Sequence, residues 1–190
     1  MSPKRQVLVF LIFVIGCVLL LSLVFGGGRK NNSAKQTPVK NNFSLLDYIE
    51  KDSKVIAITD GRINGDDAHR AVRITVDSNS RRIDIIQGYE GKVIDTRSYD
   101  NNPKAYHEFM SALAKTGFGK VKKGNFTTED GVCASGRRYV FELTENQKSV
   151  SRTWTANCAK GSSPASAEAV TSLFRRQITD YDKITTSLTL

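Results

Sequence analysis

Residues 70–99, RAVRITVDSNSRRIDIIQGYEGKVIDTRSY, decide the fold. Apolar and polar side chains alternate from Arg70 to Asp77, as expected of a β-strand with one buried face. Ser78-Asn79 and Glu90-Gly91 are turn signals, and each is followed by another strand-like segment. These two segments are residues 82–87 and 92–99.

A further strand is predicted upstream, where β-branched residues are frequent from Val55 to Ile63. Asn64-Gly65, a strong hairpin dipeptide, follows at once. Together with residues 70–99 this predicts a four-strand antiparallel meander. A second hairpin is predicted over residues 137–158.

Helices are predicted outside these strands. Ser44-Leu45-Leu46-Asp47 has the form of a capping box that opens a short helix ending near Lys51. Asn102-Pro103 supplies an N-cap and a proline in the first turn of a helix that Gly117 ends. The last helix is predicted to begin at Ser163-Pro164. Because strands and helices are segregated, the fold class is α+β, with about three helices packed on an antiparallel sheet.

Two cysteines give a specific structural prediction. A two-residue turn at Glu145-Asn146 would place Cys133 directly opposite Cys158, close enough to form a disulfide. The same register would put Tyr139, Phe141 and Trp154 on one apolar face. A disulfide indicates an oxidising, extracytoplasmic environment.

The N-terminal part of the chain predicts a membrane anchor. Residues 1–6 form a short basic tail, and residues 7–25 are an uncharged apolar run long enough to cross a bilayer as a helix. Residues 26–42 are a polar linker that begins with three glycines. The predicted domain occupies residues 43–190. The lipid bilayer is therefore an expected partner, through residues 7–25.

Two questions about this anchor stay open. Val14-Ile15-Gly16-Cys17 resembles a loose lipobox, so cleavage and lipidation at Cys17 is an alternative to an uncleaved signal-anchor helix. Counting Lys and Arg near the helix favours a cytoplasmic domain. The cysteine pair and the signal-like N-terminus favour an extracytoplasmic domain, and we adopt that single-pass orientation.

The charge distribution argues against nucleic acid as a partner. The chain has a formal net charge of +9, but six of its basic residues precede Phe43 with no acidic residue among them. From Phe43 to Leu190 there are 22 basic and 19 acidic residues, so the domain is nearly balanced. The excess of positive charge belongs mostly to the membrane flanks.

No constellation of residues predicts catalysis, a cofactor or a metal. The acidic stretch from Asp60 to Asp67 departs from a calcium loop because Arg62 occupies a ligand position. His69 and His107 are the only histidines, and neither is expected within hydrogen-bond distance of a Ser, Asp or Glu side chain inside a pocket.

A basic patch is the remaining candidate site. Adjacent residues of a strand point to opposite faces, so only one member of each arginine pair on a strand can join such a patch. The candidate residues are Arg82, Arg137, Arg152, Arg175 and Arg176. If these side chains converged they would bind a polyanion such as a wall polymer, DNA or lipid headgroups.

Three segments carry a family resemblance: Cys-Ala-Ser-Gly-Arg-Arg-Tyr at 133–139, Thr-Trp-Thr-Ala-Asn-Cys at 153–158, and residues 177–183. With the N-terminal helix and linker, they resemble uncharacterised membrane-anchored proteins of ultrasmall candidate-phylum bacteria of the Saccharibacteria type. The resemblance implies a cell-envelope protein and no catalytic residues.

The sequence therefore predicts a membrane-tethered, extracytoplasmic α+β domain that acts as a binding or structural module of a bacterial envelope, with an envelope protein or polymer as partner. The alternatives are a small envelope hydrolase using His69 or His107, and a polyanion-binding module using the arginines.

The predicted orientation can be tested with protease added to intact spheroplasts. We expect the domain to be digested, with cleavage in residues 26–42, because an extracytoplasmic domain is accessible from outside. Digestion only after lysis would show that the domain is cytoplasmic.

Overall fold

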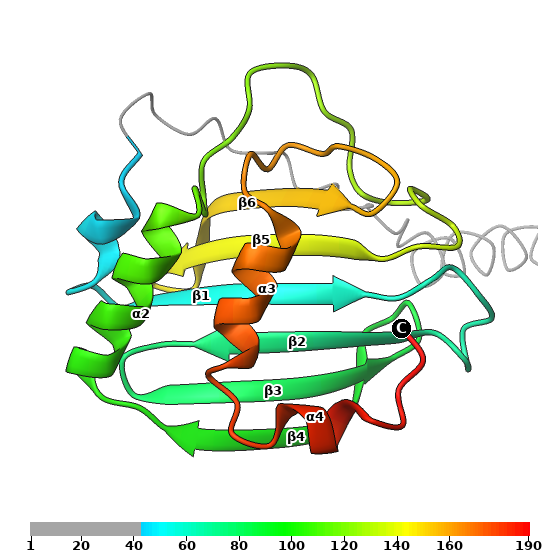
Figure 1. The fold of residues 1–190 in the computed structure, drawn as a ribbon, viewed down its shortest axis with the longest axis horizontal. Helices are drawn as coiled ribbons and strands as arrows, with labels where there is room; N and C mark the ends of the chain where they lie inside the picture. The colour runs from blue at the N-terminus through cyan, green and yellow to red at the C-terminus, as the bar shows by residue number, and fades with distance from the viewer. Residues whose placement is uncertain (1–42) are drawn as a thin grey trace, which may run out of the picture. The chain divides into compact units, whose positions relative to one another are not determined.

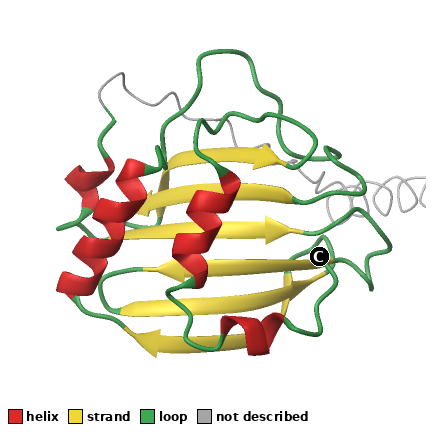
Figure 2. Cartoon of the chain, in the orientation of Figure 1, coloured by secondary structure: helices red, strands yellow, loops and turns green. Residues whose placement is uncertain are grey.

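The strands lie in the order β4-β3-β2-β1-β5-β6 and form one antiparallel sheet, with helices on one face (Figure 1). This computed structural model describes residues 43–190. The predicted tail, apolar run and linker of residues 1–42 lie outside the described residues. Within residues 43–190 no helix has the length and apolar character needed to cross a membrane. The α+β class is confirmed (Figure 2).

Strands and helices are largely segregated along the chain. The strands are β1 (Ser53–Asp60), β2 (Arg70–Val76), β3 (Ser80–Gln87), β4 (Lys92–Asp100), β5 (Arg138–Glu145) and β6 (Lys148–Ala156). The helices are the 3-10 helix η1 (Leu45–Tyr48) and the α-helices α2 (Pro103–Lys115), α3 (Ala167–Arg175) and α4 (Tyr181–Thr185).

The predicted meander is present as β1 to β4. Asp77 N donates to Ser80 O at 2.9 Å, which closes the turn at Ser78-Asn79. The first strand, however, ends at Asp60 rather than Ile63. Gly61 N still donates to Arg70 O, but beyond it the chain leaves the sheet and forms a loop closed by hydrogen bonds to Gly65 O. Asn64-Gly65 therefore lies in a longer loop instead of a tight hairpin.

The two hairpins join because β1 pairs with β5 as well as with β2. Val55 lies between Val76 of β2 and Leu143 of β5, and Ala57 lies between Ile74 and Phe141. β1 is thus a central strand, hydrogen-bonded along both edges. This pairing turns a four-strand meander and a separate hairpin into one six-stranded sheet.

The predicted register of the second hairpin is wrong. Asn146 and Gln147 form the turn with φ of 48° and 64°, and Glu145 pairs with Lys148. A register shift between Leu143 and Thr144 follows. Primed turns with two left-handed residues match the twist of a hairpin, and they favour this position over Glu145-Asn146.

The consequence is that Trp154 changes face. It pairs with Val140, whereas Phe141 pairs with Thr153. Trp154 is buried, but on the side of the sheet opposite Tyr139 and Phe141. The single apolar face that we expected for these three aromatic residues is therefore not formed.

The Cys133–Cys158 disulfide is nevertheless present, with a Cα–Cα distance of 5.7 Å. Both cysteines lie beyond the ends of β5 and β6. Asn157 N donates to Arg137 O and continues the ladder, while Gly136 N donates to Cys133 O in a turn that brings Cys133 back. The loop, rather than strand register, places the two sulfur atoms together.

The helices follow the local sequence signals, except at the starts of η1 and α3. Asn102 caps α2 as predicted, since its Oδ1 accepts from Ala105 N at 2.9 Å, and Gly117 ends the helical segment with φ of +82°. Ser44 precedes η1 without a side-chain cap hydrogen bond. α3 begins at Ala167 after the cap Ser166, because Ser163 N is bonded to Trp154 O at the β6 edge.

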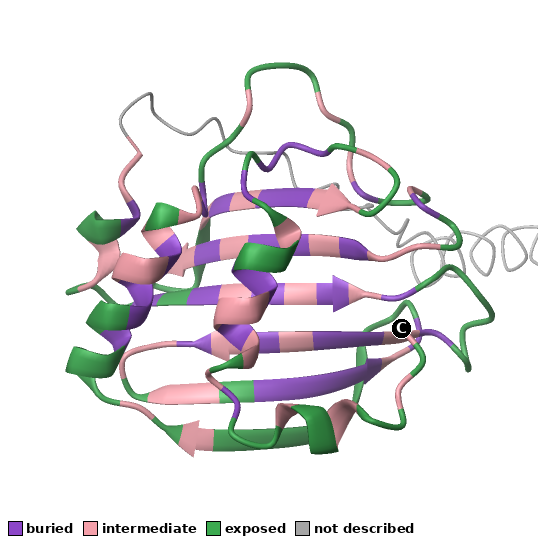
Figure 3. Ribbon diagram, in the orientation of Figure 1, coloured by how far each residue is buried: buried purple, intermediate pink, exposed green. Residues whose placement is uncertain are grey.

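The core lies between the sheet and α2 and α3, on one face only (Figure 3). Strand residues such as Val55, Ile74 and Ile83 meet Met110 and Phe174 from the helices. The alternation of buried and more exposed residues along β1 reflects this one-sided packing. Within residues 43–190 no helix lies over the opposite face of the sheet, which carries the candidate site (Figure 1).

Reduction of the disulfide should destabilise the domain. The two cysteines are separated by 25 positions in the chain, and releasing a loop of this size should lower the free energy of unfolding by about 3.5 kcal/mol. Urea unfolding of the oxidised and reduced protein measures this difference. Equal midpoints for the two forms would contradict the role assigned to the disulfide.

Candidate binding groove on the uncovered sheet face

The sheet face without helices is closed at its β5–β6 end by the loop between α2 and β5. Trp154 Nε1 donates to Thr127 O at 2.8 Å, and Arg152 makes a two-point ion pair with Glu129, with Nη1–Oε2 at 3.0 Å. Val140 and Trp154 are each only 3% exposed beneath this loop. The groove described below lies on the same face, over β1 to β4.

Asp84 is the organising residue of this part of the face. It is 3% exposed, yet it stands on β3 among the buried residues Ile83, Ile85 and Ile86. The register puts Arg73 opposite it on β2 and Thr96 opposite it on β4. A buried carboxylate is costly unless it is paired and hydrogen-bonded, and these two neighbours supply the partners.

The contacts to Asp84 are short and converge. Oδ2 accepts from Arg73 Nε at 3.0 Å, lies 2.9 Å from Arg73 Nη2, and lies 3.2 Å from Arg82 Nη2. Oδ1 accepts from Thr96 Oγ1 at 2.8 Å. One buried carboxylate thus fixes two guanidinium groups, whose side chains remain 31% and 47% exposed.

Both arginines keep hydrogen-bond donors beyond those used on Asp84. A guanidinium has five N–H donors. Within residues 43–190, Asp84 is the acceptor that Arg73 and Arg82 contact. Among the described residues, Arg82 therefore keeps its Nε and Nη1 donors, and Arg73 keeps Nη1, without a protein acceptor.

These donors line a groove of about 290 Å³. Lys54, Arg73 and Arg82 supply positive charge to its walls, and the remaining lining residues are Ile56, Thr75, Asp77, Ser80 and Ser98. Hydroxyl groups therefore lie among the cations. The three cations outnumber the two nearby carboxylates, Asp77 and Asp84.

Asp77 is engaged in the β2–β3 turn. Its Oδ1 accepts from Asn79 N at 2.9 Å and from Ser80 N at 2.7 Å. Lys54 Nζ lies 3.8 Å from Asp77 Oδ2, a loose ion pair with a side chain that is 45% exposed. Lys54 can therefore turn toward a ligand in the groove at little cost.

The structure separates the five arginines of the predicted basic patch. Arg82 lies in the groove, and Arg152 lies on β6, at the other edge of the sheet, where Glu129 holds it. Arg137 Nε donates to Leu190 O at 3.4 Å. Arg175 and Arg176 lie at the end of α3, on the helix-covered side (Figure 1).

Arg73 and Lys54 were missed as site residues. A signal for Arg73 was present in the sequence, because a turn at Ser78-Asn79 sets Arg73 opposite Asp84. An acidic residue inside an apolar strand needs a partner, and the arginine across the turn provides it. Lys54 had no such signal, because its position depends on the pairing and twist of three strands.

His69 forms a contact that the sequence analysis did not expect. Its Nε2 lies 2.8 Å from Asp60 Oδ1, and its Nδ1 lies 3.1 Å from Arg62 O. The ring is 3% exposed and stacks on Tyr89 at a centroid distance of 4.1 Å. Arg138 Nε also donates to Asp60, at 2.8 Å.

The prediction concerned a histidine inside a pocket, whereas His69 meets Asp60 as a buried side chain, so this contact does not decide it. Both ring nitrogens of His69 face oxygen acceptors within the fold, so the ring holds the loop of residues 61–69 against the end of the sheet. His107 is exposed on α2. Among residues 43–190, no group of three or more His, Cys, Asp or Glu side chains is placed to hold a metal ion.

Comparison of the chain with protein-family models, curated proteins and solved structures finds no match.

The Glu129–Arg152 pair should make stability depend on pH. Burial raises the pKa of Glu129, but the hydrogen bond and charge of Arg152 outweigh burial, and the net pKa is lowered. A lowered pKa in the folded state stabilises the protein above the unfolded value of about 4.3. This stabilisation is lost as the pH falls below that value, through the lower pKa of the folded state.

We expect Glu129→Gln to lower the free energy of unfolding by about 2 kcal/mol at pH 7, and the difference from wild type to shrink below pH 4.3. Denaturant unfolding at several pH values measures it. Glu108→Gln, at an exposed position of α2, is the matched control and should follow wild type. A difference for Glu129→Gln that does not change with pH would contradict this assignment.

Proposed function

We propose that this protein is a membrane-tethered, extracytoplasmic binding module of a bacterial cell envelope, and that its groove binds an anionic group. The observation that carries the proposal is the buried Asp84, which fixes Arg73 and Arg82 with donors left over. Side chains already held in place lose less conformational entropy when a ligand binds.

The ligand chemistry follows from the donors in the groove. Guanidinium groups recognise carboxylate and phosphate through paired N–H donors. Thr75, Ser80 and Ser98 add hydroxyl groups that can donate to further oxygen atoms. A phosphate or carboxylate group of an envelope polymer or protein would satisfy these donors. Asp77 and Asp84 limit the excess positive charge, which favours one anionic group over a long polyanion.

Two other features support the proposal that the protein is tethered to a membrane and exported. The apolar run of residues 7–25 has the length of a transmembrane helix. The Cys133–Cys158 disulfide is consistent with an oxidising compartment. Both support a domain held outside the cell close to the membrane, where anionic envelope polymers are at high local concentration.

The side chains that line the groove favour binding over hydrolysis. The described residues that line the groove include neither His nor Cys. His69, the candidate base of a hydrolase, is buried with both ring nitrogens occupied, at the end of the sheet. The groove offers charge and hydrogen-bond donors, which are sufficient for recognition.

The proposal predicts that inorganic phosphate binds the groove and that Arg82→Gln weakens this binding. We expect saturable amide shifts at Thr75 and Ser98 in the ¹⁵N-labelled full chain. We also expect about tenfold weaker binding by Arg82→Gln, equal to about 1.4 kcal/mol. Added salt should weaken binding to the wild type, because exposed charges are screened.

Arg97→Gln is the matched control, since Arg97 is exposed on β4 and pairs with Asp95 outside the groove. It should bind phosphate like the wild type. The proposal fails if both variants bind alike, or if no saturable shift appears in the groove up to about 50 mM phosphate.

A further inference from the structure

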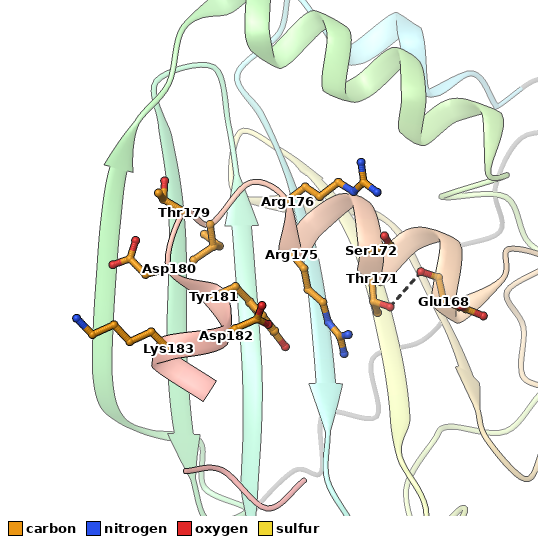
Figure 4. A pocket seen from close by; sticks show the side chains of 11 residues that line it. Glu168, Thr171, Ser172, Arg175, Arg176, Thr179, Asp180, Tyr181, Asp182 and Lys183 are labelled. Atoms are coloured by element: carbon orange, nitrogen blue, oxygen red, sulfur yellow. Dashed lines mark hydrogen bonds between the residues drawn. The ribbon is translucent and has the colours of Figure 1, made fainter. Parts of the chain in front are cut away.

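A second hollow lies on the helix-covered side of the sheet, between α3 and the segment that leads into α4 (Figure 4). Its volume is about 600 Å³, within the usual range of small-molecule sites. α3 contributes Glu168, Thr171 and Arg175, and the α4 segment contributes Tyr181 and Asp182. The sheet separates this cleft from the groove, so it is independent of the proposed anion site.

The charged side chains around this cleft are not paired with one another. Glu168 and Asp182 are acidic, and Arg176 and Lys183 are basic, yet none of them forms an ion pair with another residue of the described chain. Figure 4 shows Lys183 and Arg176 pointing away from each other. Unpaired charges of both signs therefore surround one cleft.

Asp180, unlike these four residues, interacts with a residue of the sheet. It lies by Tyr99 of β4, where burial of the phenol and the charge of this carboxylate both raise the pKa of Tyr99. Arg81 Nη1 donates to Gln177 O at 3.1 Å and fixes the same turn to the sheet. The segment between α3 and α4 is thus connected to the sheet beside the cleft.

Arg175 occupies the base of the cleft. Its Cζ lies 5.2 Å from the centroid of the Tyr181 ring, in a cation–π arrangement. Its Nε atom is buried and has no hydrogen-bond partner in the part of the chain that the structure describes. A buried donor without an acceptor is costly.

We propose that this cleft binds a small dipolar molecule that carries a carboxylate and an ammonium group, such as a short peptide with free ends. The carboxylate lies on Arg175 and accepts from the terminal nitrogens of its guanidinium group. The ammonium lies on the acidic side, against Asp182 or Glu168. Tyr181 supplies an apolar surface between the two ends.

A ligand with one sign of charge fits this cleft less well. A simple anion would approach Arg175 but would be repelled by Glu168 and Asp182. A simple cation would be repelled by Arg175, Arg176 and Lys183. A dipolar ligand places an opposite charge beside each set, and discrimination then comes from repulsion as well as attraction.

The test uses three related probes and the full disulfide-bonded chain. Trialanine has both charges, N-acetyl-trialanine has only the carboxylate, and trialanine amide has only the ammonium. We expect trialanine to bind at least tenfold more tightly than either capped peptide, as measured by calorimetry or amide shifts. The shifts should map to residues 168–183.

Two variants test which residue binds each end of the peptide. Arg175→Gln should reduce the affinity for trialanine to that for trialanine amide. Asp182→Asn, on an exposed carboxylate, should reduce it toward that for N-acetyl-trialanine. Lys148→Gln, at the exposed first residue of β6, is the control and should bind like the wild type.

Equal affinities for the three peptides would overturn the inference, as would the lack of saturable trialanine binding up to about 10 mM to a folded wild-type chain. The comparison of capped and free peptides uses only the wild type, so it decides the question even if Arg175→Gln does not fold. Phosphate binding at the groove is unaffected by either outcome.

Discussion

The pairing of β1 along both of its edges is the constraint on which the rest of the structure depends. β1 connects the meander on its β2 side to the hairpin on its β5 side. Because β4 and β5 are then at distant positions in the sheet, the chain between them must travel back across it. That return path contains α2, which lies on the same face of the sheet as α3 (Figure 1).

Because the helices of the described chain cover one face of the sheet, the two faces of the sheet differ in chemistry. The helix-covered face is apolar, and its core includes Met110 and Phe174. On the other face Asp84 is tolerated because two arginines and a threonine satisfy it. The same polar pairing that stabilises this face also leaves donors without a protein acceptor among the described residues, so stability and recognition use the same residues.

Loops are held to the sheet by a few specific polar or covalent contacts. Glu129 and Arg152 fix the loop over β6, His69 and Asp60 fix the loop after β1, and the disulfide fixes the loop before β5. A disulfide needs only that two loop ends come together. This explains why the Cys133–Cys158 bond was predicted correctly from a register that proved wrong by several positions.

The sequence by itself determined the features that short segments encode. Alternation gave the strands of the meander, Ser78-Asn79 gave the turn that sets Arg73 against Asp84, and Asn102-Pro103 gave the start of α2, because these signals act over a few neighbouring residues. Only the tertiary structure decided that β1 pairs with β5, that Trp154 faces away from Phe141, and that Lys54 joins Arg73 and Arg82 in one groove. Pairing between distant strands is selected by the burial of whole faces against one another. No single segment contains that information, and a shift of one residue at a turn reverses the face of every side chain beyond it.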